Sequence, residues 1–415
     1  MTASAQPVPY DEALDTALTN VPRMPVVEVA LAEAAGRVLV DDIACDVDMP
    51  PFDKSAMDGY AVRAADIATV PAELRIVEII PAGFAPTKTI CAGECAKIMT
   101  GAPVPQGADA VVMVEDTEPV GEDRVSIGRA VETGSNICLR GEDVRKGQTV
   151  VTAGTVLRPF DIALAAGSGR TPLSVYASPR VAIIATGDEV VESDRTPEMG
   201  QIRNSNSHAV AARLRNSGIA ADYLGIAPDD PDATAELLRD GLTRDMLIVS
   251  GGVSMGDFDF VPGVLKGLGV EILFDSVAVK PGRPTVFGRV GDTVVFGLPG
   301  NPVSTLVITE LLLMPALRRM MGEQNPAPTM LDAVLDAPIS HKPKRASFRP
   351  VTLARSDGVW HATPVEYNGS ADLAGAARGD GFAEIPKGVR ELPAGAGARV
   401  LLLTPGVPSG ARLGG

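Results

Sequence analysis

Cationic, acidic and glycine-rich loops follow three strand-like runs in the segment 246–304, and these residue types are suited to holding an anion. The runs read MLIVSGGVSMGDFDF, VAVKPGRPTVFG and VVFGLPGNPVS. In an open α/β sheet, the ligand binds in the loops at the carboxyl ends of the strands. Here those loops carry the cations Lys280 and Arg283 and the carboxylates Asp257 and Asp259. This combination predicts a site for a phosphorylated or otherwise oxyanionic ligand that binds together with a divalent metal.

The motif SGGVSMGDFD is the strongest local signal. The consecutive Gly251 and Gly252, preceded by Ser250, let the backbone approach a ligand, and the start of the following helix favours an anion. The alternative is a tight turn with solvated aspartates. The spacing matches neither the phosphate-binding P-loop nor the GxGxxG dinucleotide fingerprint, so neither of those sites is predicted.

Two further loops offer donors to an oxyanion. In KPGRP, which ends at Pro284, the guanidinium of Arg283 can grip an oxyanion with two parallel hydrogen bonds, while Lys280 acts as a point charge. In GLPGNPVS, the hydroxyl of Ser304 can donate another hydrogen bond. The alternatives are solvated surface cations in the first loop and simple helix initiation in the second.

Paired carboxylates follow two other strand-like runs. Asp188 and Glu189 in ATGDEV could hold Mg²⁺, which prefers oxygen ligands. Asp229 and Asp230 in APDDP repeat the arrangement, although capping of the next helix explains them equally well. A charged turn is the alternative for ATGDEV.

Three loops in the first part of the chain are rich in turn-forming and polar residues. They contain Asp58 in PPFDKSAMDGYAV, Thr100 in IMTGAPVP, and Arg140 and Asp143 in RGEDV. A rigid loop that faces a ligand would explain each of them, and so would a structural turn.

Length and composition limit the class of protein. At 415 residues the chain predicts about three domains, since roughly 150 residues make one. A net charge of −15 argues against a general nucleic-acid binder, which normally presents a basic face. An acidic protein that binds an anion must therefore build a local positive pocket or recruit a metal.

The remaining composition predicts a cytoplasmic protein that neither spans a membrane nor depends on disulfides. The N-terminus lacks the apolar core of a signal peptide. The longest apolar run, TLVITELLLMPAL, is interrupted by Glu310 and Pro315 and falls short of the ~20 residues that span a bilayer. Four cysteines make no disulfide framework in a chain of this length, and three widely spaced histidines disfavour a histidine-based metal site.

The pattern of apolar residues changes along the chain. Residues 1–45 predict helices in PYDEALDTAL and VEVALAEAAGRVL, and the end of segment 140–169 becomes helical again. Between them lie short strands separated by turn residues, which indicate a β-rich insertion into an elongated N-terminal domain. Residues 179–322 alternate strands with helices, which predicts a mostly parallel sheet covered on both faces. Short strands from about residue 326 onward predict a small barrel or sandwich.

Taken together and in this order, SAMDGYA, IMTGAPVPQGADAVVMVED, RGEDV, ATGDE, SGGVSMGDFD, KPGRP and GLPGNPVS resemble the MoeA family of molybdopterin molybdenumtransferases, which also forms the C-terminal part of gephyrin. The resemblance runs over essentially the whole chain. It implies a multidomain α/β plus β protein: an elongated domain I (1–45 and 141–175), an inserted β-rich domain II (46–140), an α/β molybdopterin-binding domain III (176–325) and a β-barrel domain IV (326–415). It also implies a homodimer whose active-site cleft combines domains III and IV of one subunit with domain II of the other.

The resemblance implies an enzyme that inserts molybdate into adenylylated molybdopterin in an Mg²⁺-dependent step and releases AMP. The implied catalytic residues are Asp58, Thr100, Asp143, Glu189 and Asp259, of which Glu189 and Asp259 would bind the metal. Nucleotide and molybdopterin would be held by Ser250, Gly251 and Gly252 together with Asp188, Asp229 and Asp230, and which carboxylate acts in each of the pairs Asp188–Glu189 and Asp229–Asp230 stays open. Molybdate would be held by Lys280, Arg283, Pro284, Ser304, Arg349 and Ser370, with Arg345 as an alternative to Arg349. The molybdopterin adenylyltransferase and the molybdoenzymes that accept the product would be its protein partners.

Two positions depart from the family pattern. Cys138 stands in NICLRGED where an arginine is usual, and Ser276 stands in FDSVAVKPG where some bacterial members have a lysine. These losses leave Arg140, Lys280 and Arg283 with a larger share of anion binding. Two other functions stay open: an adenylyltransferase acting one step earlier, which would need only the α/β domain, and a non-catalytic scaffold like gephyrin.

Overall fold

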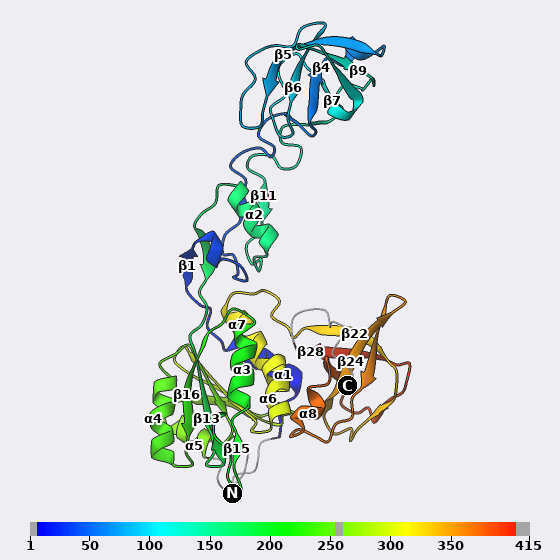
Figure 1. The fold of residues 1–415 in the computed structure, drawn as a ribbon. Helices are drawn as coiled ribbons and strands as arrows, with labels where there is room; N and C mark the ends of the chain where they lie inside the picture. The colour runs from blue at the N-terminus through cyan, green and yellow to red at the C-terminus, as the bar shows by residue number, and fades with distance from the viewer. Residues whose placement is uncertain (1–5, 254–259, 404–415) are drawn as a thin grey trace. The chain divides into compact units, whose positions relative to one another are not determined.

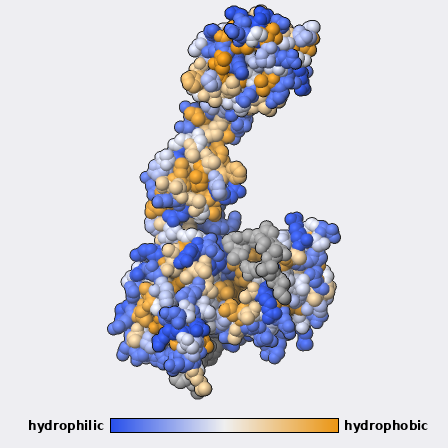
Figure 2. Space-filling view, in the orientation of Figure 1, coloured by the Kyte–Doolittle hydropathy of each residue, from blue (hydrophilic) through white to orange (hydrophobic). Residues whose placement is uncertain are grey.

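The computed structural model describes residues 6–253 and 260–403, which fold into two compact units. Unit 1 comprises the chain up to Glu28, Gly36–Val40 and the chain from Ser174 onward; unit 2 comprises Val29–Ala35 and Asp41–Leu173 (Figure 1). Hydrophilic residues cover most of the visible face of each unit (Figure 2). No helix in the described part of the chain is long and apolar enough to cross a membrane.

Unit 2 contains a six-stranded, mostly antiparallel sheet. Its order is β7-β4-β6-β5-β9-β8, in which only the pair β5–β6 is parallel. The strands are β4 (Gly59–Val62), β5 (Ala72–Ile80), β6 (Glu94–Ile98), β7 (Ala110–Met113), β8 (Thr117–Val120) and β9 (Arg124–Ile127). Buried side chains such as Ile67, Leu74 and Val112 form its core. The predicted strands of this β-rich segment are confirmed.

Short elements complete unit 2. The strand pairs are β3 (Lys54–Ser55) with β10 (Ile137–Cys138) and β2 (Ile43–Ala44) with β11 (Thr149–Val151). The predicted helix at the end of segment 140–169 is α2 (Pro159–Gly167).

The helix predicted for VEVALAEAAGRVL is wrong. The segment contains β1 (Val26–Val29) and a single 3₁₀ turn at Leu31–Glu33, whereas PYDEALDTAL does form a helix, α1 (Tyr10–Thr19). β-branched valines favour extended backbone, and β1 alternates exposed with half-buried residues as a strand does. Gly36, at φ +76°, then turns the chain in a conformation that a helix does not allow.

A six-stranded sheet forms the centre of unit 1, in the order β16-β13-β17-β21-β20-β18. The first four strands run parallel, whereas β20 is antiparallel to both of its neighbours, β21 and β18. They are β13 (Val181–Thr186), β16 (Ala221–Ala227), β17 (Met246–Ser250), β18 (Glu271–Ser276), β20 (Pro284–Val290) and β21 (Thr293–Leu298). Every residue of β13 and β17 is buried, because helices cover both faces of the sheet.

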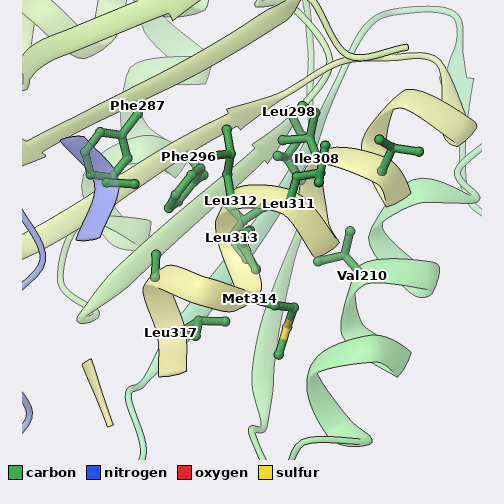
Figure 3. Packing of buried hydrophobic residues seen from close by; sticks show 14 of the residues in the cluster. Val210, Phe287, Phe296, Leu298, Ile308, Leu311, Leu312, Leu313, Met314 and Leu317 are labelled. Carbon is green, nitrogen blue, oxygen red and sulfur yellow. The ribbon is translucent and has the colours of Figure 1, made fainter. Parts of the chain in front are cut away.

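The helices of unit 1 divide between these two faces. One face packs on α1, α3 (Asn206–Arg215), α6 (Pro302–Ile308) and α7 (Met314–Met320); the other packs on α4 (Pro231–Gly241) and α5 (Val261–Gly267). Between α6 and α7 lies one π-helical turn at Thr309–Leu313, whose leucines point into the core beside Phe296 (Figure 3). The predicted strand and helix alternation is confirmed.

The C-terminal strands close into a barrel. Its ring is β24-β25-β22-β28-β26, and a direct pairing of β24 with β26 closes it. The strands are β22 (Met330–Leu335), β24 (Ala346–Ser356), β25 (Val359–Pro364), β26 (Gly381–Ile385) and β28 (Gly397–Leu402). Strand β19 (Val279–Lys280) pairs with β24 and places Lys280 opposite Ser347. The protein is thus multidomain α/β plus β, and the four exact domain boundaries stay a prediction.

Candidate functional site

A cavity of about 1040 Å³ lies in unit 1, where the loops after the parallel strands meet the barrel. Thr186, Ser250 and Pro299 line it, and each stands at or just after the carboxyl end of a parallel strand. Ser347 and Arg349 line it from the barrel strand β24. The location is the one that the sequence predicts for a ligand in an open α/β sheet.

The cavity brings together many of the sequence-predicted residues but not all of them. Those that line it are Glu189, Ser250, Gly251, Gly252, Lys280, Arg283, Pro284, Ser304, Arg349 and Ser370. Asp188, Asp229 and Asp230 belong to unit 1 but do not line the cavity, and Asp58, Thr100 and Asp143 belong to unit 2. Asp259, and Asp257 beside it, lie outside the described residues.

The glycine pair after β17 is required by close packing. Gly251 and Gly252 have positive φ angles of +97° and +65°. A Cβ on Gly252 would stand 2.7 Å from Oγ1 of Thr186 and 2.8 Å from Cγ2 of Val261, so no side chain fits there. Thr186 is buried, and its Oγ1 has no hydrogen-bond partner among the described residues. The loop therefore presents backbone and an unused hydroxyl at the edge of the cavity.

Asn206, at the start of α3, joins two of the cavity loops. Its Nδ2 donates to Oγ of Ser250 at 3.0 Å and to the carbonyl oxygen of Gly300 at 2.8 Å. One amide thus ties the end of β17 to the loop after β21. Asn206 was not predicted from the sequence as a site residue, although it stands in the helix-starting triplet SNS after ATGDEV.

Basic side chains converge on the cavity without neutralising partners. Four basic side chains line the cavity: Lys280, Arg283, Arg345 and Arg349. Among the described residues, no carboxylate lies within ion-pair distance of any of these four. Burial, and then repulsion from Arg283, lower the pKa of Arg345. Burial lowers the pKa of His341, and repulsion from Lys280 and Arg349 lowers it further. An oxyanion would relieve this accumulated positive charge.

Neutral donors stand among these cations. Oγ of Ser347 and the phenol oxygen of Tyr367 are buried and have no hydrogen-bond partner among the described residues. Nδ2 of Asn301 donates to Oγ of Ser370 at 2.9 Å, which holds that hydroxyl at the start of α6. Buried polar atoms normally find partners, so unpartnered ones beside a cavity indicate a ligand or water.

The carboxylates of unit 1 divide between the cavity and local structure. Glu189 lines the cavity, whereas Oδ1 of Asp188 accepts a hydrogen bond from the backbone N–H of Asp229 at 3.0 Å. Oδ1 of Asp230 accepts from the N–H of Ala233 at 2.8 Å and caps α4. In the described part of the chain no group of three or more His, Cys, Asp or Glu could hold a metal. One carboxylate still fits Mg²⁺, which is often bound by one or two carboxylates together with substrate phosphates.

Replacing Asp230 with alanine separates its capping role from a role in substrate binding. Loss of the cap is expected to lower the free energy of unfolding by about 1 kcal/mol, since the N–H of Ala233 loses its acceptor. Asp230→Ser keeps a capping oxygen and should restore most of that stability. Urea unfolding followed through Trp360 measures the change; an Asp230→Ala protein as stable as the wild type would contradict it.

In unit 2, Asp58 and Thr100 form one hydrogen-bonded pair. Oδ1 of Asp58 accepts from the backbone N–H of Thr100 at 2.7 Å and from its Oγ1 at 2.8 Å. Both bonds lower the pKa of Asp58, and the backbone bond has the larger effect. The N–H of Asp143 donates to the carbonyl of Met49 at 3.0 Å, and burial raises the pKa of the nearby Cys138 thiol. Cys138 is therefore a neutral thiol and supplies no charge.

The Thr100→Val variant is expected to raise the pKa of Asp58 part of the way toward its ordinary value. The substitution removes the hydroxyl donor but keeps the stronger backbone bond. Because the bonds favour the carboxylate, their stabilising effect is present above the ordinary carboxyl pKa and is lost as the pH falls through the lowered one. Carboxyl-detected NMR titration measures the shift, and Thr100→Ser, which keeps the hydroxyl, should titrate like the wild type. An unchanged titration in Thr100→Val would refute the assignment.

Comparison with known proteins agrees with this architecture. Residues 8–169 match the MoeA N-terminal region (domain I and II), residues 182–319 a probable molybdopterin binding domain, and residues 332–403 the MoeA C-terminal region (domain IV). The molybdopterin molybdenumtransferase of Bacillus subtilis is 35% identical over 96% of this chain and 94% of its own length. The chain belongs to the MoeA family.

Other relatives support this membership. The molybdopterin molybdenumtransferase 2 of Mycobacterium tuberculosis is 38% identical over 91% of this chain and 95% of its own length. The crystal structure of the molybdopterin biosynthesis MoeA protein of Pyrococcus horikoshii OT3 matches with a TM-score of 0.79 and 32% identity, covering 96% of this chain and 100% of that one. The resemblance stated from the motifs is thereby confirmed, and the chain is an enzyme of molybdenum cofactor biosynthesis.

Proposed function

We propose that this chain inserts molybdate into adenylylated molybdopterin and releases AMP. The observation that carries the proposal is a set of cations that have no ion-pair partner among the described residues, including Lys280, Arg283 and Arg345, around one cavity of a chain whose net charge is −15. Molybdate is a tetrahedral dianion, and charged donors together with hydroxyls are the groups that bind such an ion. The relatives named molybdopterin molybdenumtransferase support the transfer of molybdenum to a molybdopterin.

The residues of the cavity divide into three groups by the task that each would perform. The cations and the hydroxyls of Ser304, Ser347 and Ser370 are placed to bind oxyanions and to stabilise the charge that develops when a phosphate leaves. The Gly251–Gly252 loop allows a phosphate to approach the backbone. Glu189, together with substrate phosphates, would hold Mg²⁺, whose chemistry is to neutralise phosphate charge.

The deciding experiment is AMP release from adenylylated molybdopterin, with and without molybdate and Mg²⁺. We expect release that requires both and that falls at least tenfold in Glu189→Gln. The exposed turn residue Asp292 does not line the cavity, and Asp292→Asn is the matched control. Absence of release from folded wild-type protein would reject the proposal, and release of pyrophosphate from ATP and molybdopterin would favour an adenylyltransferase.

Four further points belong to the proposal. The chain is a homodimer, which sedimentation equilibrium tests, and a monomer at assay concentration would contradict it. Asp58, Thr100 and Asp143 take part in the reaction, which Asp58→Asn tests by its AMP release. The protein works in the cytoplasm and receives its substrate from an adenylyltransferase.

A further inference from the structure

The guanidinium of Arg349 lies over an aromatic ring, and both side chains line the cavity. Its guanidinium carbon lies 5.4 Å from the centre of the Tyr367 ring, within the range of a cation–π interaction. No carboxylate stands at ion-pair distance from Arg349 among the described residues, although Arg213, Arg158 and Arg180 are each paired with one. Arg349 is thus held by a partner that leaves its full charge available.

The loop that carries Tyr367 is anchored on both sides. Before the tyrosine, the N–H of Val365 donates to the carbonyl of Pro350 at 2.9 Å, which ties the loop to β24 next to Arg349. After it, the N–H of Val303 donates to the carbonyl of Ser370 at 3.2 Å, which ties the loop to α6. The loop that carries the ring is therefore anchored to both the barrel strand β24 and the helix α6.

The phenol of Tyr367 adds a second indication. Its oxygen is buried and without a hydrogen-bond partner among the described residues, and burial raises its pKa to about 12. The side chain is therefore neutral at physiological pH and does not cancel the charge of Arg349. An aspartate or glutamate in its place would orient the guanidinium equally well but would neutralise it and repel an oxyanion.

We propose that Tyr367 is a positioning residue, whose ring holds the guanidinium of Arg349 toward the cavity so that an unneutralised cation is presented to the oxyanion substrate. The inference rests on the proposed function, since it assigns the support of one of the cations that bind molybdate. In the described part of the chain two other arginines stack on rings, Arg23 on Tyr176 and Arg355 on Trp360, but none of these residues lines the cavity.

The test is calorimetric titration of the full-length protein with molybdate, combined with the KM for molybdate in AMP release. Tyr367→Leu is expected to weaken molybdate binding about tenfold and to raise KM similarly, with little change in kcat. Tyr367→Phe keeps the ring and should bind within about twofold of the wild type. Trp360→Leu removes the ring of the other barrel pair and should bind normally. If Tyr367→Leu fails to fold, Tyr367→Met replaces it.

A double-mutant cycle shows whether Tyr367 acts through Arg349. In an Arg349→Ala background, Tyr367→Leu should produce no further loss of affinity. Wild-type affinity in Tyr367→Leu, an equal loss in Tyr367→Phe, or an equal loss with and without Arg349 would each overturn the inference while leaving the proposed function intact. A wild type that binds no molybdate would instead overturn the proposed function.

Discussion

Replacing Glu310 with methionine is expected to destabilise unit 1 by about 3–5 kcal/mol, because it leaves the guanidinium of Arg213 buried without a counter-charge. The two side chains are only 5% and 7% exposed, and both carboxylate oxygens of Glu310 accept hydrogen bonds from Arg213. The pair joins α3 to the π-helical turn between α6 and α7. The loss should appear in urea unfolding followed through Trp360, the one tryptophan of the chain.

The two halves of this pair should differ when each is removed alone. Burial raises the pKa of Glu310, so in Arg213→Met the glutamate can take up a proton and become neutral, whereas an arginine keeps its charge. Arg213→Met should therefore cost less than Glu310→Met. A raised folded-state pKa adds stability below the ordinary carboxyl pKa and loses it as the pH rises, so the deficit of Arg213→Met should be smaller at pH 5 than at pH 8.

Two controls make the prediction specific. The double variant Arg213→Met with Glu310→Met should recover most of the lost stability, because no buried charge remains. Glu271→Gln breaks the exposed pair with Arg289, in which the side chain of Glu271 is 64% exposed and that of Arg289 is 46% exposed. This variant should lower the free energy of unfolding by at most about 1 kcal/mol. Equal unfolding midpoints for Glu310→Met and Glu271→Gln would show that the buried pair has no special role.

The sequence was informative where the chemistry is local. Strands followed by glycine and cation-rich loops predicted the parallel sheet and the residues at its carboxyl edge, such as Gly251, Lys280 and Arg283, because side-chain periodicity and turn chemistry act over a few residues. Local sequence patterns could not decide whether Asp230 caps a helix or binds a ligand. It also assigned a helix to VEVALAEAAGRVL, where alternating valines form a strand.

The contribution of the barrel could not be predicted in the same way. Ser347 lines the cavity because β24 lies beside β19 in a register that pairs Ser347 with Lys280. Tyr367 lines the cavity because its loop is tied to both β24 and α6. Such long-range pairings leave no signal at a fixed spacing. Burial of Arg213 against Glu310, 97 positions apart, is hidden for the same reason.

Replacing Arg345 with methionine is expected to weaken molybdate binding by about tenfold to a hundredfold, since a hydrogen bond to a charged group contributes about 1.5–3 kcal/mol. Nη1 of Arg345 donates to the carbonyl of Val279 at 3.2 Å, which keeps the side chain beside Arg283 in the cavity wall. Burial and repulsion from Arg283 both act against the charged form of Arg345 in the ligand-free protein. A bound dianion reverses that cost because it attracts both cations at once.

This arrangement predicts opposite effects on stability and binding. Without ligand, the Tm of Arg345→Met should equal or exceed that of the wild type, because the variant removes a partly buried, repelled charge. With saturating molybdate the order should reverse, because only the wild type gains the full stabilisation of the bound state. Arg355→Met removes an exposed barrel arginine that does not line the cavity. This variant should change neither the increase in Tm that molybdate produces nor the affinity for molybdate. A ligand-free Tm clearly below that of the wild type would mean that Arg345 serves the fold rather than the anion.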